Sequence, residues 1–132
     1  MTLGSYNLLR AAVDMDQRLS SDGKFLGRFN VMGTKKGNFQ QNVGHEQFVL
    51  NPSFKYNASE NTNVIFEYIL SQNNFEGGFS RYAYGIDGFK EVKKNFSFSD
   101  PIMNPTKSWE HNIYETINHN FNEDWLLTLC VV

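Results

Sequence analysis

Apolar and polar residues alternate along several stretches of this chain, as they do in β-strands with one apolar face and one wet face. Leu9, Val13 and Met15, for example, alternate with residues such as Asp14 and Asp16. The pattern predicts five strands and the beginning of a sixth: Asn7–Leu19, Phe25–Thr34, Gln47–Tyr56, Val64–Ser71, Trp109–Phe121 and a last strand from Trp125.

The connections between these strands are alternately short and long. Short polar turns are expected at Ser20–Lys24, Asn57–Asn63 and Asn122–Asp124, and longer irregular segments at Lys35–Glu46 and Asn73–Ser108. Successive connections of an up-and-down sheet fall at opposite ends, and bacterial outer-membrane barrels have short turns at one end and long loops at the other. The sequence therefore predicts an all-β fold, an antiparallel up-and-down meander of about six strands that is part of an outer-membrane β-barrel.

One stretch permits a second interpretation. Ile113 and Ile117 are four residues apart, which also fits a helix over Ser108–Asn118. The β-branched and Asn residues of this stretch favour a strand instead.

Composition narrows the classes of protein. The chain has 132 residues, which allows one domain, and a net charge of -2, which does not point to nucleic acid as a partner. It has 12 Phe but a single cysteine, Cys130, so an internal disulfide is impossible. No apolar run reaches the ~20 residues of a membrane helix, whereas alternating strands can cross a bilayer at moderate hydropathy.

The sequence gives no sign of catalysis or of a resident metal. Nucleophile elbows, P-loops and dinucleotide fingerprints are absent from it. His45, His111 and His119 do not have the spacing of metal ligands and have no cysteine partner. We expect no enzyme activity, no catalytic residues, no cofactor and no metal held by protein ligands.

Three motifs carry a family likeness. The first runs from Leu8 to Gly33, LLRAAVDMDQRLSSDGKFLGRFNVMG, and the second from Phe48 to Val64. The third is His119–Trp125, HNFNEDW. In this order they resemble the early barrel of TonB-dependent siderophore receptors, especially the ferrichrome-receptor-like branch. The positions that match in the first motif are Arg10, Ala11, Asp14, Leu19, Ser20, Asp22, Gly23, Lys24, Arg28, Phe29 and Asn30.

The resemblance implies a transporter that takes up iron–siderophore complexes across the bacterial outer membrane. Its partners would be the ferric siderophore, a plug domain, the TonB energy-transducing system and outer-membrane lipid, with iron arriving only as a siderophore chelate. We expect the chain to lack the plug and the signal peptide and to supply too few strands for the 22-stranded barrel of that family. We therefore expect residues 1–132 to be a partial barrel, truncated at both ends.

Alternation assigns side chains to the two sides of such a wall. Apolar positions such as Phe29, Phe48, Phe54 and Phe66 would face lipid, and the charged positions between them would face a polar lumen. The predicted lumen-facing residues are Arg10, Asp14, Asp16, Arg18, Arg28, Lys55 and Glu67. Asp14 and Asp16 are flanked by Arg10 and Arg18, which favours an ion-pair ladder over a catalytic carboxylate pair. A soluble sheet with one solvated face would produce the same pattern.

Aromatic and basic residues gather in the long segment and directly after it. In siderophore receptors such residues surround the ligand, because rings provide contact area and Arg complements an anionic chelate. The ligand-binding candidates are Phe79, Arg81, Tyr82, Tyr84 and Trp109. Alternatively, these rings only pack the segment against its neighbours. A different class of function, a small soluble β-barrel that binds a lipid-like ligand, also fits the length of the chain.

Overall fold

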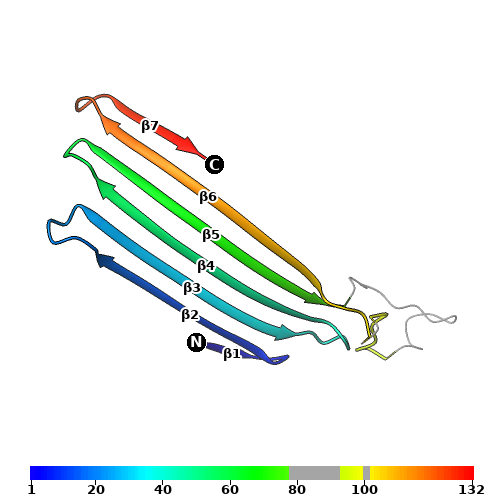
Figure 1. Ribbon diagram of the computed structural model, residues 1–132. Coiled ribbons are helices and arrows are strands. Elements are labelled where there is room, and N and C mark those ends of the chain that lie inside the picture. The colour runs from blue at the N-terminus through cyan, green and yellow to red at the C-terminus, as the bar shows by residue number, and fades with distance from the viewer. Residues whose placement is uncertain (78–92, 100–101) are drawn as a thin grey trace. The chain divides into compact units, whose positions relative to one another are not determined.

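The chain forms one open antiparallel sheet of seven strands in the order β1-β2-β3-β4-β5-β6-β7 (Figure 1). The computed structural model describes residues 1–77, 93–99 and 102–132. The strands are β1 Thr2–Gly4, β2 Leu8–Arg18, β3 Phe25–Gly37, β4 Gly44–Asn57, β5 Thr62–Glu76, β6 Thr106–Asn120 and β7 Leu126–Val131. The predicted all-β, up-and-down meander is confirmed, and β1 is an additional strand that alternation did not reveal.

Four strands are longer than the sequence pattern predicts. β3 continues to Gly37 and β4 begins at Gly44, so the predicted long segment Lys35–Glu46 shrinks to residues 38–43. β5 continues past Ser71 to Glu76, and β6 begins at Thr106, before the predicted Trp109. Backbone pairing does not require apolar side chains, so the ladder extends into polar residues where the apolar pattern has ended. The alternative helix over Ser108–Asn118 is wrong, because this stretch lies within β6.

The predicted separation of short and long connections holds at one end of the sheet only. Residues 19–24, 58–61 and 121–125 form the three tight turns of that end. At the other end, the β1–β2 connection is also tight, with positive φ angles of 59° at Tyr6 and 57° at Asn7. The Gly37 amide donates a hydrogen bond of 2.7 Å to the Tyr6 carbonyl, which places this turn beside the end of β3. Of the connections at this end, the β5–β6 connection, residues 77–105, is the long one.

The chain divides into two compact units. The first contains residues 1–11, 33–48 and 72–108, and with them the connections β1–β2, β3–β4 and β5–β6. The second contains residues 12–32, 49–71 and 109–132, and with them the three tight turns.

Neither unit has a hydrophobic core among the described residues. No hydrophobic side chain there is buried, and Phe29, Phe48, Phe54 and Phe66 are 40%, 39%, 36% and 40% exposed. A sheet with an apolar face normally buries it against another layer. The described part of this chain supplies no such layer for the apolar face of the sheet.

Among the described residues, no helix is both long and apolar enough to cross a membrane.

The β2–β3 turn is held by a small hydrogen-bond network around Asp22. The Ser20 hydroxyl and the Lys24 amide both donate to Asp22 Oδ1, at 2.5 and 3.1 Å. Gly23 adopts a φ of 72°, which a residue without a Cβ reaches at no steric cost. These contacts lower the pKa of the Asp22 carboxyl from its usual value, the Ser20 hydrogen bond being the main cause.

We predict that Ser20→Ala raises the pKa of Asp22 toward its ordinary value, because it removes this main cause. The lowered pKa stabilises the fold above the unfolded-state pKa of about 3.9, and this contribution is lost as the pH falls through the folded-state pKa. Titration of the Asp22 carboxyl by NMR measures the shift, with Ser21→Ala as the matched control. Equal Asp22 pKa values in the two variants would contradict the prediction.

Candidate functional site

The polar side of β2 and β3, in the second unit, carries a bidentate ion pair. Arg28 Nε and Nη2 donate to the two carboxylate oxygens of Asp14, at 3.0 and 2.6 Å. Both side chains remain about half exposed, so the pair is solvated. Asp14 thus pairs across the strands with Arg28, and the expected ladder with Arg10 and Arg18 along β2 is not what the structure shows.

Amide and hydroxyl side chains continue this polar character on β5, β6 and β7. Asn118 Nδ2 donates to Asn63 Oδ1 at 3.1 Å, and the Thr128 hydroxyl donates to Asn118 Oδ1 at 2.9 Å. Because cross-strand hydrogen bonds join side chains on one side of a sheet, Asn63, Asn118 and Thr128 share a face.

The opposite side of the second unit is mainly apolar, and Phe25 stacks on Phe54 with ring centroids 5.8 Å apart. On β6, however, polar and apolar side chains are not separated onto opposite faces. Glu115 lies directly opposite Val131 in the β6–β7 register, and Ile117 lies opposite Leu129. A carboxylate therefore shares a face with apolar side chains on this strand.

Two histidines of β6 accept or donate hydrogen bonds across to β5. The Tyr68 hydroxyl lies 2.8 Å from His111 Nδ1, and the Thr62 hydroxyl lies 2.8 Å from His119 Nδ1. In the first unit, His45 Nε2 lies 3.2 Å from Asn73 Oδ1, and its ring stacks on Phe75. Among the described residues there is no group of His, Cys, Asp or Glu side chains arranged to hold a metal ion.

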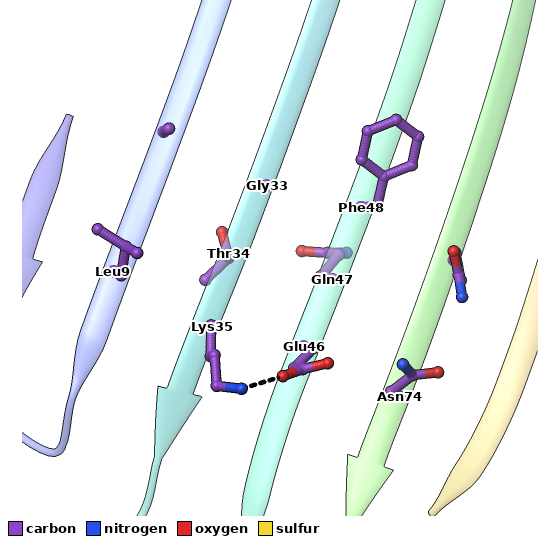
Figure 2. A pocket seen from close by; sticks show the side chains of 10 residues that line it. Leu9, Gly33, Thr34, Lys35, Glu46, Gln47, Phe48 and Asn74 are labelled. Carbon is purple, nitrogen blue, oxygen red and sulfur yellow. Dashed lines mark hydrogen bonds and ion pairs between the residues drawn. The ribbon is translucent and has the colours of Figure 1, made fainter.

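A shallow hollow of about 470 Å³ lies on one face of the first unit. Figure 2 shows Lys35 and Glu46 reaching toward one another at one side of it, with Leu9 and Phe48 lying further along the strands. Gly33 has no side chain, and a Cβ added there would meet nothing within 4 Å, so the space beside it is open. The hollow is lined by Leu9, Ala11, Gly33, Thr34, Lys35, Glu46, Gln47, Phe48, Gln72 and Asn74.

The hollow is lined by both apolar and polar side chains. Leu9 and Phe48 are apolar, whereas the Lys35–Glu46 ion pair and the amides of Gln72 and Asn74 are polar. Lys35 and Glu46 were placed in an irregular segment by the sequence pattern, so their pairing could not be foreseen. The apolar character of this face therefore ends within the first unit, at the level of the ion pair.

A second hollow, of about 270 Å³, lies beside the β1–β2 turn of the first unit. Its lining includes the rings of Tyr6 and Phe39 and the ammonium-bearing side chain of Lys36. This combination of aromatic and basic residues has the chemistry expected for the ligand site. The sequence pattern did not indicate it, because Tyr6 and Phe39 are far apart in the chain and only the β1–β2 turn brings them together.

Most of the predicted ligand-binding residues lie outside the part of the chain that the structure describes. Phe79, Arg81, Tyr82 and Tyr84 lie outside the described residues. Trp109 is described: it lies near the start of β6 and is 57% exposed. The structure therefore leaves the predicted ligand site as a prediction.

The predicted lumen-facing residues all lie within strands. Four of them are on β2, and one each is on β3, β4 and β5: Arg10, Asp14, Asp16, Arg18, Arg28, Lys55 and Glu67. The Asp14–Arg28 ion pair places those two on a common face. That this face lines a lumen remains a prediction.

No protein-family model matches the chain, and no curated protein is detectably related to it.

We predict that Arg28→Glu destabilises the β2–β3 hairpin, because it places a third carboxylate beside Asp14 and Asp16. The charge swap Asp14→Arg with Arg28→Asp should restore most of the loss, since it rebuilds the pair in the opposite sense. Urea unfolding of the full chain in detergent micelles measures both effects, with Lys55→Glu as the control for an added negative charge elsewhere. A swap that unfolds as readily as Arg28→Glu would show that the pair does not stabilise the hairpin.

Proposed function

We propose that this chain forms part of the wall of a bacterial outer-membrane β-barrel, of the type found in TonB-dependent siderophore receptors. The observation that carries the proposal is a two-faced, seven-stranded sheet in which no described hydrophobic side chain is buried by protein. A bilayer would cover the apolar face, and a water-filled or plugged interior would hydrate the charged one.

The lengths of the strands support this proposal. β2 to β6 contain 11, 13, 14, 15 and 15 residues. Strands of globular proteins most often have about 5–6 residues, whereas a tilted strand needs about 9–11 to cross the hydrocarbon layer. Each of the five could therefore cross a membrane, and most would extend beyond it.

The change from apolar to charged side chains along one face of the first unit also supports the membrane wall. Along β4, apolar residues occupy every second position from Phe48 to Tyr56, and Glu46 takes the next position of the same series. An outer barrel face changes in this way where a strand leaves the hydrocarbon for the headgroup region. Glu115 is an exception on β6, because a charged side chain on a face that meets lipid needs a partner.

A small soluble barrel that carries a lipid-like ligand is less well supported. Such a barrel would close on itself, whereas β1 and β7 lie at the two edges of this sheet. Every residue of β7 is exposed, and its sequence LLTLCV carries no charge. An uncovered apolar edge of this kind is a liability for a protein in water.

In the proposed receptor, this segment would contribute wall and one long loop to the capture of a ferric siderophore. Transport would need the other parts of the protein, namely a plug domain and further strands, together with the TonB system. Phe79, Arg81, Tyr82, Tyr84 and Trp109 remain the candidates for contact with the chelate, and the Tyr6–Lys36–Phe39 hollow is a further place with suitable chemistry.

If the sheet is part of a membrane wall, neighbouring side chains of β5 should face lipid and water in turn. In a Cys130→Ser background, a fluorophore on Phe66→Cys in lipid vesicles should be quenched by nitroxide-labelled lipid. The same fluorophore on Glu67→Cys should respond instead to iodide in the aqueous phase. The two positions are adjacent in sequence, so they control for local structure.

Equal quenching of the two positions by lipid nitroxide would contradict the membrane wall. A folded, monomeric chain in plain buffer, with neither position reached by lipid, would favour the soluble barrel.

Ligand capture predicts that Trp109 senses the chelate and Trp125 does not. Ferric chelates absorb light and quench nearby tryptophan fluorescence, and the chain has only these two tryptophans. With Trp125→Phe, titration with a ferric trihydroxamate or triscatecholate should quench the remaining fluorescence to saturation. With Trp109→Phe, quenching should be weak and linear. Identical curves in the two variants would exclude a site near the start of β6.

A further inference from the structure

The backbone is closely surrounded at Gly77, where the β5–β6 connection begins. Gly77 has a φ of 84°, and a Cβ added there would lie 2.3 Å from the Asn42 carbonyl oxygen. It would also lie 2.8 Å from Ser99 Oγ and 3.0 Å from Val43 Cγ2. Backbone and side chains from three segments of the first unit thus meet at a point that only glycine fits.

Hydrogen bonds tie the far side of the connection to the same point. Asn42 Nδ2 donates to the Ser99 carbonyl at 3.0 Å, and the Gln41 amide donates to the Asn95 carbonyl at 2.8 Å. A longer contact, 3.4 Å, joins Gln40 Nε2 to the Phe96 carbonyl. Residues 93–99 are therefore fastened to the β3–β4 turn.

Burial singles out the same place. Ser99 is 6% exposed and is the one buried residue in the described part of the chain. Phe96 and Phe98 pack edge to face beside it, with centroids 5.1 Å apart. Among the described residues, Ser99 is thus the residue that its surroundings cover most completely.

We infer that Gly77, Asn42 and Ser99 form a neck that holds the start of the β5–β6 connection and residues 93–99 together against the β3–β4 turn. Bringing the two ends of a long loop together costs conformational entropy. Contacts in the neck offset that cost during folding, so that less entropy is lost when a ligand binds. The inference rests on the proposed function, in which this connection contributes to chelate capture. The three neck residues would be positioning residues, acting through the loop without touching the ligand.

The test compares two glycines of the full chain in micelles. Gly77→Ala places a methyl group against the Asn42 carbonyl, whereas Gly33→Ala adds the same methyl in open space. Gly77→Ala should accelerate hydrogen exchange of the Gln41 amide about tenfold or more and weaken ferric chelate binding by a similar factor. Gly33→Ala should change neither.

A second variant separates the neck from general misfolding. Asn42 has a φ of 57°, which glycine adopts readily, so Asn42→Gly removes the bond to the Ser99 carbonyl without backbone strain. Asn42→Gly should also accelerate exchange of the Gln41 amide and weaken chelate binding, but by less than Gly77→Ala. If Gly77→Ala does not fold, Asn42→Gly alone tests the neck.

The two readouts fail separately. Unchanged Gln41 exchange in both neck variants would overturn the neck. Faster exchange with unaltered chelate affinity would overturn its positioning role. If the unsubstituted chain binds neither the trihydroxamate nor the triscatecholate chelate, the proposed function fails with the positioning role, and the exchange data still decide whether the neck exists.

Discussion

The structure depends on one constraint: its strands have two chemically different faces, and the described part of the chain covers neither of them. Hydrophobic burial is the main favourable term in folding. Here Phe29, Phe48, Phe54 and Phe66 keep more than a third of their surface exposed. In the proposed membrane wall, the surroundings supply this missing burial. A bilayer on one side and a polar interior on the other satisfy both faces, which is why the membrane wall explains the sheet better than a free-standing domain.

The two units solve the problem of connecting strands differently. In the second unit, short turns such as that around Asp22 use side-chain hydrogen bonds and a positive φ at Gly23. In the first unit, the long connection is fastened at its base through Asn42, Gly77 and Ser99. Local sequence determines the first kind of connection. Contacts between residues far apart in the chain, such as Asn42 and Ser99, determine the second.

Alternation in the sequence was sufficient to predict the all-β meander, because residues on one face of a strand recur at every second position. It missed the ends of β3, β4 and β5, where Lys35, Glu46 and Gln72 continue the ladder without apolar side chains. It also missed the partner of Asp14, since the register between β2 and β3 is not visible in either strand alone. The Tyr6–Lys36–Phe39 hollow and the neck at Gly77 arise from long-range contacts and left no pattern to detect.

The exposed β7 strand has a practical bearing on the handling of this protein. Its free backbone groups lie at the edge of the sheet, and the sequence LLTLCV offers neither charge nor proline to keep other chains away. In water, such an edge recruits further copies and starts cross-β aggregates. Refolding directly into detergent would keep this edge out of plain water, and reducing conditions would protect the exposed Cys130 thiol.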